Sequence, residues 1–169
     1  MSQPPARRLH STGRPLRTQP AVLVCLLLAL ALLTAAAGAP AQDRGLSGLR
    51  GERLGDAEMA QGTTIIVVWA SWSPRSRDIV DRVNPLASRW RQHARVVTVD
   101  FQEDRQVVET FLAGKGLDAP VFLDADGAFS KKYAVATLPG LLIVKNGRVA
   151  YHGKLPDDPD RLIAEITPP

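Results

Sequence analysis

The sequence predicts an α/β fold in which one β-sheet is covered by helices. Residues 64–69 form an uninterrupted apolar run, which is typical of a central strand buried on both faces. After Pro74, apolar residues recur every three to four positions between charged ones, as in an amphipathic helix. A second apolar run at residues 95–101 indicates another strand of the parallel type.

The first 41 residues are predicted to be an export segment. Four arginines precede an uncharged, Leu- and Ala-rich run at residues 21–37. Small residues follow, so cleavage after Ala37 or Ala41 would fit a signal peptide. The run is also near the lower limit for spanning a bilayer, so an uncleaved signal anchor is the alternative. We therefore expect an exported chain, periplasmic or extracytoplasmic, free or anchored to the inner membrane, with a linker at 42–45 and one domain at 46–169.

The charge of the chain gives no sign of a nucleic-acid partner. The net charge is +4, and the arginines at positions 7, 8, 14 and 17 account for all of it. The remaining 17 Lys and Arg residues balance the 17 Asp and Glu residues. Since no basic excess is left in the domain, binding to nucleic acid is not expected.

Cysteine and histidine usage limits the available chemistry. Cys25 is the only cysteine and lies in the export segment, so the mature domain can form no disulfide. Its two histidines, His93 and His152, are far apart in the sequence and have no metal-ligand spacing. We expect neither a metal nor another cofactor.

The first half of the domain is predicted in chain order from local patterns. Residues 46–53 alternate as a short edge strand or hairpin, and the central strand at 64–69 follows. The helix from Pro74 should bury Ile79, Val80, Val83, Leu86 and Trp90. Asn84 and Pro85 interrupt it, so we expect a bend near residues 81–84.

The second half predicts three more strands and three more helices. A helix at 105–112 should turn Val107, Val108, Phe111 and Leu112 inward, before a short strand at 120–123. A turn at 124–127 leads into a helix at 128–133. Asn146 and Gly147 give a hairpin signal between a strand at 141–144 and one at 149–152, which Gly153 should end. A helix at 159–167 closes the domain, with Leu162, Ile163 and Ile166 inward.

Residues 69–77 are the most informative segment of the chain. They read Trp-Ala-Ser-Trp-Ser-Pro-Arg-Ser-Arg, between the end of a strand and the start of a helix. This segment resembles the active site of the thioredoxin superfamily, and within it the TlpA/ResA type of thiol-disulfide reductase with its W-A-S-W-C-P-x-C-R pattern. Every position is kept except the two cysteines, which are Ser73 and Ser76 here.

A second segment carries the same resemblance. Residues 133–144 resemble the family's Y-x-V-x-x-x-P-T segment, with Pro139 at the cis-proline position and Gly140 in place of the usual threonine. The helix and strand before Asp124 match the insertion of TlpA-type proteins. The resemblance implies a thioredoxin-like fold: a central mixed β-sheet flanked by helices, with that helix-strand insertion.

The residues at the degenerate site predict no catalysis. A serine hydroxyl forms no S–S bond and is too weakly acidic to become a nucleophile at a helix terminus. Val67 lies six residues before Ser73, where the family often has a proton-managing group, so a buried proton acceptor is expected to be absent. Neither histidine is predicted near Ser73, whose expected role is to cap the following helix.

The remaining surface predicts binding. In the family, substrates lie across the turn and pair with backbone beside the cis-proline. The matching residues here are Trp72, Ser73, Pro74, Arg75, Leu138 and Pro139, which would form a peptide-binding groove for an extracytoplasmic polypeptide. Packing of Trp72 over its own loop is the plainer alternative. Two other functions stay open: a thiol-disulfide oxidoreductase, as homology would suggest, or a structural subunit of an envelope complex.

Overall fold

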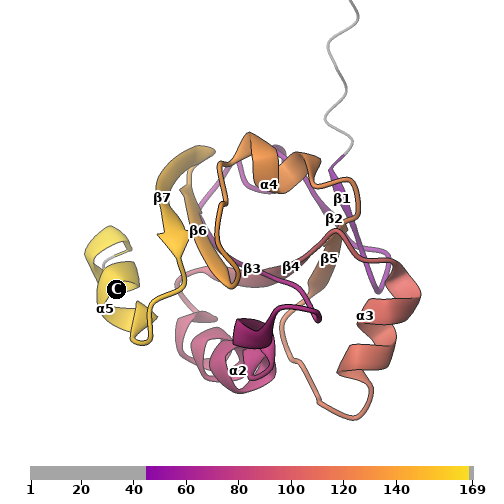
Figure 1. Cartoon of the computed structure of the whole chain (residues 1–169). Coiled ribbons are helices and arrows are strands. Elements are labelled where there is room, and N and C mark those ends of the chain that lie inside the picture. Colours follow the sequence, from indigo (N-terminus) through magenta and orange to yellow (C-terminus); the bar gives the residue numbers. More distant parts are fainter. Residues whose placement is uncertain (1–44, 168–169) are drawn as a thin grey trace, which may run out of the picture. The chain divides into compact units, whose positions relative to one another are not determined.

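The computed structural model describes residues 45–167, so the expected export segment 1–41 lies outside the described residues. Figure 1 shows this part as a central sheet with helices on both faces. The strands are β1 (Leu46–Gly48), β2 (Arg53–Leu54), β3 (Thr63–Trp69), β4 (Arg95–Phe101), β5 (Val121–Asp124), β6 (Gly140–Lys145) and β7 (Arg148–Lys154). The helices are α2 (Ile79–Trp90), α3 (Arg105–Leu112), α4 (Ala128–Lys132) and α5 (Pro159–Ile166). Within this part of the chain, no helix has the length and apolar character needed to cross a membrane.

Strand β3 lies within a mixed sheet, as its sequence predicts. The seven strands are ordered β2-β1-β5-β4-β3-β6-β7. Strand β3 pairs in parallel with β4 and antiparallel with β6, and each of its residues is buried. β1 and β2 form the expected hairpin at one edge, while β7 forms the other edge after the predicted turn at Asn146 and Gly147. The apolar sequence of β3 follows from burial on both faces.

Two hydrophobic cores lie on opposite faces of the sheet. Alternate side chains of a strand point to opposite faces, so Ile65 and Val67 enter one core while Ile66 and Val68 enter the other. Helices α2, α3 and α5 cover the first core, and α4 covers the second through Phe129. The loop after β3 therefore emerges at the rim of a sheet held firmly from both sides.

The helix predicted from Pro74 begins later in the structure. Pro74–Ser76 is a separate turn of 3-10 helix, and α2 starts only at Ile79, after Asp78. Ser76 is fully buried and closes the tight turn, so the chain descends toward the core before it enters the α-helix. Proline fixes φ at a value that suits both kinds of helix, which is why the sequence does not distinguish them.

The α2 helix, Ile79–Trp90, is continuous through Pro85. Asn84 bonds on both sides of a neighbouring loop, donating to the Gly116 carbonyl at 2.9 Å and accepting from the Asp118 N–H at 3.0 Å. The interruption at Asn84 and Pro85 therefore does not end the helix, and the predicted bend near residues 81–84 stays a prediction. Tertiary packing and these bonds offset the hydrogen bond that proline removes.

Two local predictions are wrong. Val107 is 46% exposed, whereas Val108 on α3 is buried. Neighbouring residues on a helix differ by about 100° in direction, so both cannot face the same core. Gly153 does not end β7; it pairs with Leu141 inside the strand. A side chain there would meet the Tyr151 hydroxyl at 2.6 Å, so the glycine permits close packing and is not a strand breaker.

Candidate functional site

The loop after β3 forms one side of the candidate site. Ser73 donates its backbone N–H to the Ala70 carbonyl at 3.1 Å, and the N–H of Ser76 bonds to the Ser73 carbonyl at 2.9 Å. Ser73 is 5% exposed and Ser76 is fully buried. The two predicted degenerate positions thus lie in one tight turn at the end of the sheet.

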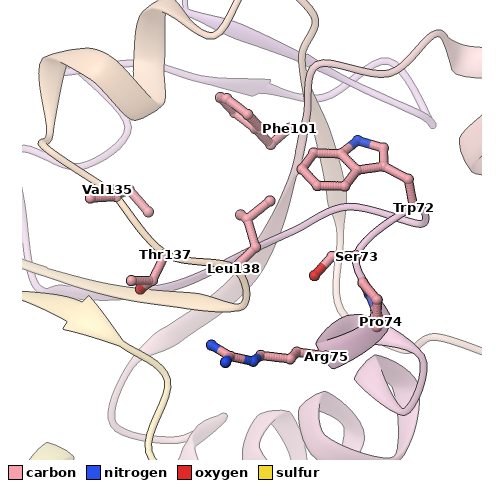
Figure 2. A pocket seen from close by; sticks show the side chains of 9 residues that line it. Trp72, Ser73, Pro74, Arg75, Phe101, Val135, Thr137 and Leu138 are labelled. Atoms are coloured by element: carbon pink, nitrogen blue, oxygen red, sulfur yellow. The ribbon is translucent and has the colours of Figure 1, made fainter.

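The predicted capping role of Ser73 is wrong. Its side chain makes no capping hydrogen bond, although its backbone lies in the extended conformation usual for such a residue. The hydroxyl of Ser76 is buried without a partner among the described residues. The N–H of Ser76 bonds to the Ser73 carbonyl instead, and Figure 2 shows the Ser73 hydroxyl directed to the pocket.

The segment after α4 forms the opposite side. Tyr133 donates to Asp56 at 2.8 Å, which fixes the start of this segment. Burial and that bond raise the pKa of Tyr133 to about 12. The peptide bond between Leu138 and Pro139 is cis, and Pro139 accepts a backbone bond from Leu155 at 3.0 Å. Both ends of the segment are therefore attached to the body of the domain.

Gly140 lets this segment lie close against β6. A Cβ atom at this position would lie 2.6 Å from Cγ1 of Val135 and 2.7 Å from the Thr137 carbonyl oxygen. Such distances do not occur for ordinary side chains, so a larger residue would push the segment outward. The glycine that replaces the threonine usual in the resembled family thus determines the shape of the site.

The two sides enclose an open pocket with a volume of about 450 Å³. Its lining consists of Trp72, Ser73, Pro74, Arg75, Phe101, Val135, Ala136, Thr137 and Leu138. Figure 2 shows Trp72, Phe101 and Leu138 gathered on one side, with Arg75 reaching along the other edge from the 3-10 turn. Trp72 is 60% exposed, so its indole does not pack into the core. We call this pocket the groove.

Most of the predicted groove residues meet there. Pro139 is the exception, because it is buried beneath the segment and does not line the groove. The sequence prediction missed Phe101, Val135, Ala136 and Thr137. Phe101 is the last residue of β4, and its position at the same sheet edge as the β3 loop could have identified it, because β3 and β4 are parallel.

The backbone at the groove has unused hydrogen-bonding groups. Within residues 45–167, neither Thr137 nor Leu138 forms a hydrogen bond through its backbone N–H or carbonyl group. Thr137 is also exposed. Unpaired backbone groups beside an exposed aromatic residue are the features that allow an extended peptide to add to a fold.

Behind the loop lies a carboxyl pair that sequence reasoning missed. Glu103 accepts hydrogen bonds from both the N–H and the hydroxyl of Ser71, each at 2.5 Å. Asp100 is fully buried beside it, and neither of its carboxyl oxygens has a partner among the described residues. Burial, followed by the neighbouring carboxyl groups of Glu103 and Asp124, raises the pKa of Asp100 to about 8.

The structure does hold a buried acid, although it lies on the strand beside β3 and not at the position six before Ser73. Val67 does occupy the position six before Ser73, but Asp100 supplies a buried acid from the adjacent strand, in register with Trp69. At neutral pH Asp100 is mostly protonated, while Glu103 receives the two bonds of Ser71. The sequence feature that could have revealed this buried acid is Asp100 itself, an aspartate at an inward-facing position of the otherwise apolar strand β4.

Among residues 45–167, no histidine or carboxyl group lines the groove. Neither His93 nor His152 lines it. Across the described part of the chain, no group of three or more His, Cys, Asp or Glu side chains is arranged to hold a metal ion. The chemistry of the groove is that of an apolar surface, two hydroxyl groups and one guanidinium.

The fold and the position of the groove define a thioredoxin-like α/β class. The crystal structure of StoA from Bacillus subtilis matches with a TM-score of 0.59 and 24% identity, over 69% of this chain and 90% of that one. A secreted disulfide oxidoreductase of Mycobacterium tuberculosis matches with a TM-score of 0.60 and 16% identity, over 73% and 94%. At these identities the likeness establishes the fold.

The chain belongs to the Redoxin family, whose model matches residues 36–166. It is also similar to sporulation thiol-disulfide oxidoreductase A of Bacillus subtilis (strain 168), with 28% identity over 91 residues. That match covers 51% of this chain and 55% of the relative. The chain is thus a thioredoxin-like member of the Redoxin family, and it is matched along about half the length of this curated relative.

Proposed function

We propose that this chain is an exported, redox-inactive member of its family that binds extended segments of extracytoplasmic proteins. The observation that carries the proposal is the groove, in which the exposed Trp72 faces backbone of Thr137 and Leu138 that forms no hydrogen bonds within the described residues. A peptide laid across the groove would pair with that backbone and place a side chain against the indole. No thiol is needed for such binding.

In this proposal, Ser73 and Ser76 stand where a redox-active relative has its two cysteines. Thiol-disulfide exchange requires a thiolate that attacks a disulfide and a second thiol that resolves the mixed disulfide. Two serines supply neither, and the only cysteine, Cys25, precedes the domain. The retained loop, groove and anchoring bonds of Ser71 then serve positioning and not electron transfer.

The proposed location outside the cytoplasm rests on the sequence and on relatives. The segment 1–41 has the charge and hydropathy of an export signal or an anchor. The Mycobacterium tuberculosis structural relative is described as secreted, and a Streptococcus pneumoniae relative as an exposed lipoprotein thioredoxin. A partner of this chain would accordingly be an extracytoplasmic polypeptide.

Family membership favours a second candidate, a thiol-disulfide oxidoreductase. It can be separated from the first by dithiothreitol-linked insulin reduction with the full-length chain. We expect no rate above background, because neither Ser73 nor Ser76 can form a mixed disulfide. Turnover that persists in a Cys25→Ala variant would refute the redox-inactive proposal.

Binding is tested by calorimetric titration of the full-length chain with blocked extended peptides that carry a central leucine. We expect saturable binding that Trp72→Ala weakens by at least fivefold, because the variant removes most of the exposed aromatic surface. Val107→Ala is the matched control, since Val107 is an exposed side chain on α3 that does not line the groove. Absence of binding, or equal loss in both variants, would overturn the proposed role of the groove. A structural subunit would instead co-purify with one partner that covers Trp72.

A further inference from the structure

The groove has two chemically different edges. Trp72, Phe101 and Leu138 provide an apolar side that suits an aliphatic or aromatic side chain (Figure 2). The other edge carries Arg75, the only charged residue among those that line the groove. No acidic residue of the lining neutralises it. An occupant that matches both edges must combine an apolar group with an anion.

Arg75 is also available for an external partner. Some arginines of the domain are engaged within it, such as Arg82 with Asp157 and Arg105 with Glu109. The neighbouring Arg77 has no such partner among the described residues, but it does not line the groove. Within residues 45–167, Arg75 forms no ion pair or hydrogen bond and its side chain is exposed. Its backbone is nevertheless fixed, because it lies between Pro74 and Ser76 in the 3-10 turn. A cation is thus held beside an apolar pocket without an internal counterion.

The unpaired backbone of Thr137 and Leu138 identifies the occupant as a polypeptide. A small apolar acid would satisfy Arg75 and the apolar side, but it would leave these N–H and carbonyl groups without partners. An extended chain satisfies all three features, because it presents backbone groups along one edge and side chains on alternating sides. The pocket volume of about 450 Å³ can receive one large side chain of such a segment.

Building on the proposed function, we infer that the groove selects extended segments in which an apolar residue is flanked by an acidic one. The apolar side chain packs against Trp72 and Leu138, and the carboxylate pairs with the Arg75 guanidinium. Arginine suits this role because its planar donors can bind a carboxylate through two parallel bonds. A segment with basic residues beside the apolar one is rejected by charge repulsion, so the chain discriminates among unfolded or extended partners by sign of charge.

The test compares three blocked peptides that differ only beside a central leucine: Asp-Leu-Asp, Asn-Leu-Asn and Lys-Leu-Lys. Binding to the full-length chain is measured by calorimetry at low and at high ionic strength. We expect the acidic peptide to bind about two- to fivefold more tightly than the neutral one at low salt, which is the upper range of an exposed charge pair. Salt should reduce this advantage, because it screens exposed charges.

Charge reversal provides the decisive control. Arg75→Gln should bind the acidic and neutral peptides equally, and Arg75→Glu should prefer the basic peptide. Arg77→Gln is the matched control, because Arg77 is exposed but does not line the groove, so it should keep the preference. Thermal denaturation of each variant checks that it is folded.

The outcomes separate this inference from the proposed function. Equal binding of all three peptides would overturn the charge selection and leave peptide binding intact. No binding of any peptide would overturn both. Octanoate serves as a small apolar acid. If it competes with the acidic peptide and its affinity is higher than that of the peptide, the choice of a polypeptide as occupant is overturned. A preference that survives Arg75→Gln but not Arg77→Gln would refute the assignment to Arg75.

Discussion

Replacing Asp100 by asparagine should stabilise the protein above neutral pH. The side chain is fully buried, and burial together with the neighbouring carboxyl of Glu103 raises its pKa from 3.8 to about 8. An acid with a raised pKa holds its proton more tightly in the folded state than in the unfolded state. Its contribution to stability is therefore complete below about pH 4 and is lost as the pH rises toward 8.

The magnitude follows from the same shift. Folding loses at most about 1.4 kcal/mol of stability per pH unit in this window, so the full rise would correspond to about 6 kcal/mol. Water entry and local rearrangement reduce the penalty of a buried charge. We therefore expect Asp100→Asn to exceed the wild type by about 2–4 kcal/mol at pH 8, and the two to differ little near pH 4.

Urea denaturation of both proteins at several pH values from about 4 to 9 measures this difference directly. The gap in the free energy of unfolding should widen with pH and level off above about 8. Asp104→Asn is the matched control. Asp104 is exposed at the N-cap position of α3 and its side chain makes no capping hydrogen bond, so its substitution should leave the dependence of stability on pH as it is in the wild type. Parallel profiles for wild type and Asp100→Asn would refute the assignment of a buried, proton-holding acid.

Three further changes test close contacts and hydrogen bonds, two beside the groove and one at the far end of α2. Ser71→Ala removes the hydroxyl that donates to Glu103 at 2.5 Å and should lower the free energy of unfolding in urea by about 1–3 kcal/mol, whereas Ser71→Thr should retain most of the stability. Equal stability of the wild type and the two variants would contradict the anchoring role. Gly140→Ala should cost about 1–3 kcal/mol, since its Cβ would lie 2.6 Å from Val135, and an unchanged melting temperature would argue against this close approach. Asp160→Ala leaves the indole N–H of Trp90, at the end of α2, without its acceptor at 2.7 Å, so we expect the free energy of unfolding to fall by about 1–3 kcal/mol, and to fall less in Asp160→Asn. Identical losses in both variants would show that the bond is unimportant.

Local patterns predicted the elements well and their ends poorly. The residues of β4 and α3 match the predicted ranges, because apolar periodicity is a property of the local sequence. The start of α2 at Ile79 and the continuation of β7 through Gly153 were not predictable, since a neighbouring turn and a neighbouring strand determine them. Val107 failed for a similar reason: three apolar neighbours leave the helix face ambiguous until the core selects one.

The candidate site divides in the same way. The motif at residues 69–77 and the segment at 133–144 pointed to Trp72, Arg75 and Leu138, which do line one groove. Whether peptide binds there stays a prediction. Phe101 could have been found from the parallel pairing of β3 and β4, which brings its end of β4 to the loop after β3, whereas nothing in the sequence around Thr137 marks that residue.

The sequence by itself determined the order of strands and helices, the hairpin turn at Asn146, and the absence of thiols at Ser73 and Ser76. Those properties depend on residue type and on neighbours along the chain. Only the tertiary structure decided that Gly140 shapes the groove and that Asp100 holds a proton near pH 8. The physical reason is that close approach and desolvation depend on what surrounds a residue in space, and those surroundings come from strands and loops far away in the sequence.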